Sequence, residues 1–477
     1  MNDLAVRLRQ YRPRSPVVFG IGVAILAVAL LTGTGIWLVA LAIGIPTACA
    51  VALRPQRGVI LLTVVLPFDG FIKQFGPGFL NPWKQVIILG LLVLTFVCPE
   101  KARAPKGRKL PGWTWAVAGL LVLGFLSATT VDRQTALVGL RISFFSIFLA
   151  VTIWRCPLTR RDRDHLVSAF VLVAIVTSLI GLWQQVVGES YLHSLGYAYG
   201  DTIRFTSGFT LRSFSTFNLP FPFGFYLMLA ILIALPMSLA EPKRLRSKVF
   251  FVSLPLLLIA LLYTFVRGAF LGLAVGLLYL AFHRYKYLVY GLPFLLIAAF
   301  FIPSGATITN AVFSSSSLQE RTLSWGDRLD LFADNPFGTG IGTTGAAAEK
   351  AAKLNFQNPD LTYVPDNTWL KEMFELGVLG LWMLVLLFAA LVVSMRATER
   401  KSTGIDRDFL SGATAQLLAI AAASFVATYL ELVPMDQLFW VMIAIAATME
   451  PQIPRTPAVY RPGMRGLLPG GVRSADG

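Results

Sequence analysis

Long apolar runs recur along the 477-residue chain, and short clusters of lysine and arginine separate them. Hydrophobic residues make up 56% of the chain and charged residues only 14%, whereas about 25% of a soluble globular protein is charged. A membrane helix needs roughly 20 apolar residues, so fourteen of them would occupy roughly 280 residues. The pattern excludes a soluble enzyme, a disordered protein and a disulfide-stapled secreted domain, and it predicts an all-α integral membrane protein.

We expect a polytopic helical bundle of about fourteen transmembrane helices with a large extracytoplasmic loop. The predicted spans are 17–33, 36–53, 58–68, 85–98, 112–130, 135–154, 166–187, 220–240, 249–266, 268–283, 287–302, 376–395, 409–428 and 435–449. They divide the chain into N-terminal transmembrane helices over 1–302 with an outer loop at 188–219, a large extracytoplasmic loop over 303–375, C-terminal transmembrane helices over 376–450, and a disordered cytoplasmic tail over 451–477.

The distribution of charge predicts which connections face the cytoplasm. One alternating set carries 29 lysines and arginines against 10 acids, and the other carries 11 against 15, with Arg141 alone inside a span. The sums of +19, −4 and +1 recover the net charge of +16. Because basic residues collect on the cytoplasmic side, we expect both termini inside and an even number of spans. The basic excess is then a topology signal, which argues against a nucleic-acid partner.

Three cysteines, Cys49, Cys98 and Cys156, fall near predicted cytoplasmic span ends and form no CxxC motif. An odd number without metal-ligand spacing argues against a disulfide framework and a zinc site. We expect neither a metal nor a cofactor. The apolar run near the N-terminus resembles a signal sequence, but it leads straight into a second apolar run and should be retained.

Arg267 interrupts a nearly unbroken apolar stretch from Phe250 to Phe282. Such a length cannot cross the membrane once, so two spans should fold back there with the arginine near the outer interface. An arginine at membrane depth is costly unless it is paired or faces a wet cavity. The residue is either a snorkelling turn residue or, as we favour, an anion-binding group over a cavity.

Further arginines occupy the outer segments. Arg204 and Arg212 flank a Thr/Ser/Gly/Phe-rich stretch just before the span at 220–240, and each could instead be an interface anchor. Guanidinium groups bind diphosphate in a bidentate manner, and three of them could hold one without a metal. Arg328 lies among acids in the large loop and should pair locally, whereas Arg141 should pair within the bundle rather than touch a substrate.

A transferase with a hydroxyl nucleophile needs a base. Asp366, Glu372 and Glu375 precede the span at 376–395, and His193 is the only histidine predicted outside. Asp366-Asn367 also has the form of a helix N-cap. The run GTGIGTTG at 338–345 resembles a nucleotide-binding loop, but it lacks a strand–turn–helix context. It should instead form a tight turn that allows close backbone packing.

The ordered motifs RFTSGFTLRSFSTF, FVRGAFLGL, RTLSW…NPFGTGIGT and PDNTWLKEMFELGVLGLW, over about 200–395, resemble the O-antigen ligase and Wzy-type polysaccharide polymerase superfamily. The resemblance implies a metal-independent transferase of the bacterial inner (plasma) membrane that uses an undecaprenyl-diphosphate-linked glycan on the outer side. It implies that Arg267, Arg321 and either Arg204 or Arg212 bind diphosphate. It also implies partners in the membrane lipid and in a chain-length regulator and a flippase of the same pathway.

The family's ligases place a histidine where this chain has Asp366, before Asn367. This departure favours a polymerase of exopolysaccharide, capsule or O-antigen, with Asp366, or alternatively Glu372 or Glu375, acting on the acceptor hydroxyl. A ligase that transfers the glycan to another acceptor is the nearest alternative. A flippase or transporter for lipid-linked glycan is a third, but it should carry cations through a central cavity. In this chain the polar residues that are predicted to lie outside are concentrated in two loops instead.

Overall fold

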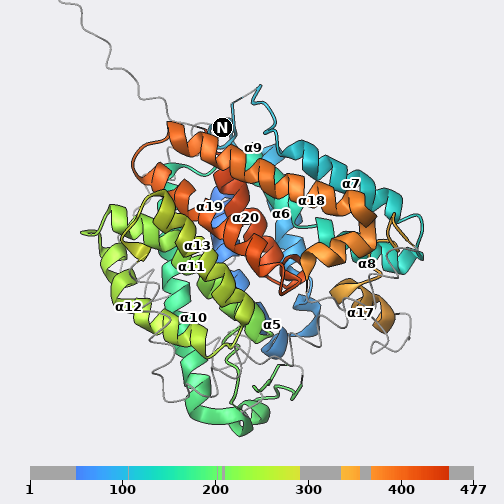
Figure 1. Ribbon diagram of the computed structural model, residues 1–477, viewed down its shortest axis with the longest axis horizontal. Coiled ribbons are helices and arrows are strands. Elements are labelled where there is room, and N and C mark those ends of the chain that lie inside the picture. The colour runs from blue at the N-terminus through green and yellow to red at the C-terminus, as the bar shows by residue number, and fades with distance from the viewer. Residues whose placement is uncertain are drawn as a thin grey trace, which may run out of the picture.

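The computed structural model describes residues 50–105, 107–200, 202–206, 210–289, 335–354 and 367–450, and all of its regular elements in these ranges are helices (Figure 1). The α-helices are α4 (Pro55–Val65), α5 (Asp69–Phe75), α6 (Trp83–Val97), α7 (Thr114–Ser127), α8 (Arg133–Phe144), α9 (Ile147–Arg155), α10 (Arg160–Ser194), α11 (Pro220–Ala240), α12 (Leu245–Leu262), α13 (Arg267–His283), α17 (Gly345–Leu354), α18 (Thr368–Lys401), α19 (Ile405–Ala423) and α20 (Met435–Ala447). Short 3-10 turns include η1 (Leu66–Phe68), η2 (Gly78–Leu80), η3 (Glu100–Ala102) and η5 (Tyr429–Glu431).

Helix α11 lies at the centre of the bundle. It is apolar on every side and almost wholly buried, as a helix without a polar face must be. Helices α10, α12, α13 and α19 pack around it, and α13 and α19 also form the most extensive helix pair (Figure 1). Small residues allow this approach, because a side chain at Gly272 or Gly276 would meet the backbone of α19.

The architecture is that of a polytopic membrane protein. Within the described ranges, five helices are long and apolar enough to cross a membrane, namely α4 with α5, α10, α11, α12 and α18, and the pair α8 and α9, bent by 43°, would make a sixth. Shorter apolar helices coincide with predicted spans at α6, α7, α13 and α20. The predicted spans 17–33, 36–53 and 287–302 lie wholly or mostly outside the described residues. The total of fourteen therefore stays a prediction, as do the large loop and the tail.

Contacts between connections follow the sidedness that the charges predict. On the predicted cytoplasmic side, Gln56 Nε2 donates to the Ala102 carbonyl at 2.7 Å, and the Cys98 and Cys156 sulfurs are 3.7 Å apart as free thiols. On the predicted outer side, the Phe71 amide donates to the Thr216 carbonyl at 3.0 Å. Segments assigned to one side thus contact one another, although they are far apart in sequence.

Arg141 lies in α8, within the bent pair of α8 and α9 that would make the sixth span, and its side chain is exposed. It has a partner on a neighbouring helix, as the sequence predicts: Gln85, in the amide orientation that satisfies its surroundings, accepts from Arg141 Nη2 at 3.0 Å. The prediction of one continuous helix over 135–154 is wrong, because α8 ends at Phe144 and α9 begins at Ile147 with a bend of 43°.

A buried ion pair joins α10 to α19 at the predicted cytoplasmic side. Arg163 Nη2 and Asp406 Oδ1 are 2.6 Å apart and both side chains are buried. We expect Asp406→Ala to lower the free energy of unfolding by about 3–5 kcal/mol, because it leaves a buried guanidinium without its counter-charge. Thermal unfolding in detergent measures the loss, and the double substitution Arg163→Met with Asp406→Leu should recover most of it. Equal destabilisation by the double variant would contradict this explanation.

Candidate functional site

Arg212 is fixed at the turn between α12 and α13. Its Nε donates to the Thr264 carbonyl at 3.1 Å and its Nη2 to the Phe265 carbonyl at 3.3 Å, while the guanidinium lies 4.9 Å from the Phe221 ring centroid. Its backbone amide donates to the Arg204 carbonyl at 2.8 Å, which ties two of the predicted arginines into one short antiparallel contact. The outer loop before α11 therefore lies against the start of α13.

The chain folds back at Arg267, as the sequence predicts. Helix α12 ends at Leu262, and α13 begins with Arg267 as its first residue. Between them Phe265 adopts a positive φ of 52°, which is rare for a residue with a bulky side chain. Such strain persists where the surroundings over-determine it and is common at functional sites. Thr264 stabilises the turn, because its Oγ1 accepts from the Val266 amide at 3.3 Å.

The charges of the three arginines act on one another. The pKa of Arg212 is lowered to about 10, first by burial of the guanidinium and then by the positive charges of Arg204 and Arg267. All three lie together at one end of α13. The N-terminus of a helix carries partial positive charge that favours anions. A cluster of like charges beside such a terminus is stabilised by an anion with several oxygens, and the structure brings both candidates from the outer loop to Arg267 rather than selecting one.

The start of α18 contacts the same region through the segment Ser424–Thr428. The Thr368 amide donates to the Ser424 carbonyl at 2.8 Å and its hydroxyl to the Ala427 carbonyl at 3.0 Å. On the other side, a Cβ at Gly268 would lie 3.0 Å from the Val426 side chain. This short segment therefore joins the residue after Arg267 to the beginning of α18.

Asn367 is the N-cap of α18, which confirms that part of the Asp366-Asn367 prediction. Its Oδ1 accepts from the amides of Trp369 at 2.9 Å and Leu370 at 3.2 Å. Asp366 itself and Arg321 lie outside the described residues, as does Arg328. His193, the histidine predicted outside, contacts only its own segment: its Nδ1 is 3.1 Å from the Tyr197 carbonyl oxygen.

Glu375 is buried in a charge cluster that the sequence did not indicate. Lys371 Nζ is 2.8 Å from Glu375 Oε2 and 3.3 Å from Glu431 Oε1, and all three side chains are at most 3% exposed. Glu375 Oε1 also accepts from the amide and the hydroxyl of Thr344, both at 3.1 Å. These contacts suit a positioning group. Sequence analysis missed the pairing of Lys371 with Glu431, which are 60 residues apart. Its only signal in the sequence was the presence of Glu431 in the short turn before the last predicted span.

The glycine-rich run at 338–345 forms a tight turn, as predicted, and not a nucleotide loop. Gly338, Gly340, Gly342 and Gly345 all have positive φ. A Cβ at Gly338 would lie 2.5 Å from the Glu375 carbonyl oxygen, and one at Gly342 would lie 2.6 Å from the Thr135 carbonyl oxygen. The turn is wedged between α8 and α18, and only glycine allows both the conformation and the contact.

Glu372 differs from Glu375 in its surroundings. It lines a cavity of about 60 Å³ together with Lys371, Glu431, Asp436 and Ser143. A cavity of this size can hold water. Within the described ranges, no cluster of three or more histidine, cysteine, aspartate or glutamate side chains has metal-site geometry.

Known proteins share the central part of this chain. Residues 252–385 match a family described as O-Antigen ligase, a stretch that contains Arg267 and the carboxylates of α18. The O-antigen polymerase of Salmonella muenchen is 24% identical over 359 residues, which cover 68% of this chain and 84% of that protein. Both matches agree with the superfamily that the sequence motifs resemble.

Substitution of Lys371 tests the buried cluster. Burial raises the pKa of Glu431, opposed by Lys371 and reinforced by Glu375. A carboxyl group whose pKa is raised on folding destabilises the folded state progressively as pH rises above its unfolded value of about 4.3. We therefore expect Lys371→Met to lower the free energy of unfolding by about 3–5 kcal/mol at pH 8 and by less at pH 5, measured by thermal unfolding in detergent.

The matched control is Lys353→Met on α17, which removes an exposed pair with Glu349. Exposed ion pairs contribute at most about 1 kcal/mol, and no comparable dependence on pH should follow. A Lys371→Met protein with the same loss at both pH values would contradict the role assigned to the buried carboxylates.

Proposed function

With the resemblance to the O-antigen ligase and Wzy-type polymerase superfamily confirmed, we propose that this membrane protein polymerises undecaprenyl-diphosphate-linked repeat units of an exopolysaccharide, capsule or O-antigen. The reaction would take place on the outer side of the bacterial inner membrane. The observation that carries the proposal is the gathering of Arg204, Arg212 and Arg267 at the N-terminus of α13, because a diphosphate is the anion that such a cluster suits.

In the proposed reaction, the arginines hold the donor diphosphate and stabilise the charge that develops on it. The acceptor sugar hydroxyl forms the new glycosidic bond to the anomeric carbon of the donor. The bond from that carbon to the phosphate oxygen breaks, and its electron pair leaves with the lipid diphosphate. Three fixed guanidinium groups supply the positive charge that a divalent cation would otherwise bring, so the proposed transferase is metal-independent.

The proton of the acceptor hydroxyl passes to a carboxylate. We propose Asp366 as this base, with Glu372 as the alternative, because Asp366 immediately precedes the cap of α18 and Glu372 lines a cavity. Glu375 is the weakest of the three candidates, since its oxygens are occupied by Lys371 and Thr344. Its contacts suit it to hold the 338–345 turn against α18.

A ligase is the second candidate function, because the matched family is described as O-Antigen ligase. The polymerase is preferred for two reasons: the curated relative is named a polymerase, and Asp366 stands where ligases of the resembling family carry histidine. Reconstitution with a purified lipid-linked repeat unit separates the candidates. Elongated glycan supports the polymerase, transfer to a different acceptor supports the ligase, and translocation without new bonds supports a flippase.

Arg267→Ala tests the diphosphate site. We expect the reconstituted variant to lose about 100- to 1000-fold in elongation rate, since it lacks a cation aimed at the developing charge. Arg267→Lys should retain part of the rate, because the charge remains and the planar fork does not. The matched control is Arg133→Ala, an exposed arginine at the start of α8, which should elongate glycan normally. A normal rate in a correctly inserted Arg267→Ala protein would refute the proposal.

Substitution of the carboxylates tests the base. We expect Asp366→Asn to abolish elongation while the protein still binds the lipid-linked donor, because charge stabilisation by the arginines is untouched. Glu372→Gln should elongate glycan more slowly, by less than tenfold. Binding is measured by retention of radiolabelled donor and elongation by gel analysis of the product. An active Asp366→Asn protein beside an inactive Glu372→Gln protein would transfer the assignment to Glu372.

A further inference from the structure

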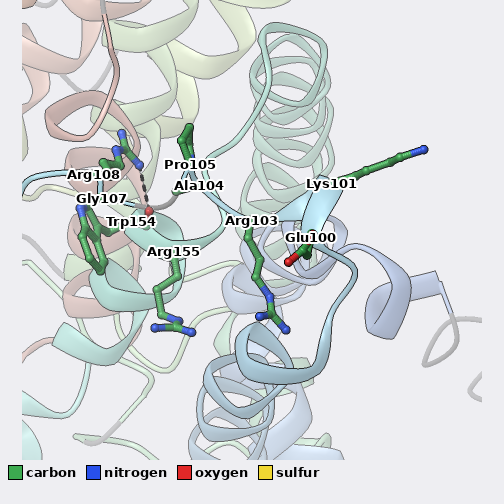
Figure 2. A pocket seen from close by; sticks show the side chains of 9 residues that line it. All are labelled: Glu100, Lys101, Arg103, Ala104, Pro105, Gly107, Arg108, Trp154 and Arg155. Atoms are coloured by element: carbon green, nitrogen blue, oxygen red, sulfur yellow. Dashed lines mark hydrogen bonds between the residues drawn. The ribbon is translucent and has the colours of Figure 1, made fainter.

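A separate cavity of about 700 Å³ lies at the predicted cytoplasmic side, where the connection after α6 crosses the end of α9 (Figure 2). The Ala104 amide donates to the Arg155 carbonyl at 2.7 Å, and this bond fixes the connection against α9. The residues that line it include Arg103, Arg108, Trp154 and Arg155. None of the lining residues belongs to the arginine cluster described above.

The lining is strongly cationic. It includes Lys101, Arg103, Arg108 and Arg155 against one carboxylate, that of Glu100. Arg108 is partly neutralised, because its Nε lies 2.7 Å from Glu450 Oε1. Figure 2 shows the side chains of Arg103, in the connection after η3, and Arg155, at the end of α9, extending in the same direction. Like charges held in parallel raise the local positive potential, and an anion between them lowers it.

Two buried donors in this wall have no hydrogen-bond acceptor among the described residues: Arg103 Nε and Trp154 Nε1. A buried donor without an acceptor costs about 1–3 kcal/mol. Neither group can accept a hydrogen bond, so a group that satisfies either of them presents an acceptor. Phosphate oxygens are acceptors and also match the charge of the cavity.

An exposed apolar surface leads from the cavity along α6. The Arg155 guanidinium lies 4.1 Å from the Phe96 ring centroid, and the Arg103 Nη2 donates to the Phe96 carbonyl. Phe96 is 58% exposed, Val97 is 70% exposed and Val93 is 61% exposed. These residues lie on an apolar helix that the sequence predicts to cross the membrane. A ligand that fits has an anionic head and an apolar tail.

We propose that this cavity binds the phosphate headgroup of an anionic phospholipid of the cytoplasmic leaflet, with an acyl chain along Phe96 and Val93. Basic pockets at the cytoplasmic ends of membrane helices recognise such headgroups. The cation–π contact orients Arg155 at the junction between head and tail. A free phosphate shares the head chemistry but would leave the apolar surface without a role, so the lipid is the occupant that the structure favours.

The test compares full-length protein in nanodiscs and detergent. Native mass spectrometry measures binding of phosphatidylglycerol against phosphatidylcholine, and thermal unfolding measures the stabilisation that each lipid gives. We expect selective retention of phosphatidylglycerol by the wild type. The double variant Arg103→Gln with Arg155→Gln should bind it about 30-fold more weakly, since each base near a membrane surface contributes roughly fivefold. The matched control, Arg160→Gln with Arg161→Gln, removes two exposed charges at the start of α10 outside the cavity and should bind normally.

Trp154→Phe provides a second test in case the double variant misfolds, because it keeps an aromatic ring and removes only the indole donor. Weaker phosphatidylglycerol binding by a stably folded Trp154→Phe protein would support the proposal. Equal retention of both lipids by the wild type would overturn it. Millimolar glycerol phosphate that stabilises the protein as much as phosphatidylglycerol would also overturn it, in favour of a soluble phosphate. None of these readouts depends on glycan elongation, so the proposed transferase activity can fail without affecting this result.

Discussion

A charge inside an apolar helical bundle is expensive unless a counter-charge or hydrogen bonds accompany it. This constraint explains where the polar side chains of this protein lie. Asp406 compensates Arg163 at the predicted cytoplasmic ends of α10 and α19, and Lys371 lies between Glu375 and Glu431 at the opposite connections. Helix α11 carries no charged residue, and its Tyr226 hydroxyl donates to the Phe170 carbonyl at 3.2 Å. Charged groups that remain clustered with like charges then mark places where a ligand completes the balance.

The arginine cluster is where we propose that a diphosphate binds. Arg212 is held by two carbonyl oxygens at a strained turn, and its pKa is depressed by the two arginines beside it. The antiparallel contact holds Arg212 beside Arg204, and the turn that includes Phe265 holds Arg212 beside the start of α13. Under the proposed function, this arrangement supplies positive charge for the diphosphate that does not have to move during the reaction.

Features of the fold and site that depend on residues close together in sequence or on sidedness could be predicted, whereas particular contacts between distant segments could not. The fold-back at Arg267 followed from local hydropathy, because no single helix could absorb such a long apolar run. The convergence of Arg204 and Arg267 followed from sidedness, since all outer segments meet at one end of the bundle. The ion pair of Lys371 with Glu431 followed neither from hydropathy nor from sidedness, because it depends on how two segments distant in sequence pack together. The bend between α8 and α9 was missed for a related reason: hydropathy averaged over 135–154 does not resolve it.

The 338–345 turn connects these observations to the proposed chemistry. Its glycines allow backbone contact with α8 on one side and with the carbonyl of Glu375 on the other, and its Thr344 is held by the Glu375 carboxylate. The start of α18 is therefore fixed both by this turn and by the segment Ser424–Thr428 beside α13. Transfer competes with hydrolysis, and the competition depends on how well the acceptor hydroxyl is aligned with the donor. Under the proposed function, a helix start anchored on two sides, joined through one short segment to the helix that begins with Arg267, helps to meet that demand without a large movement of either helix.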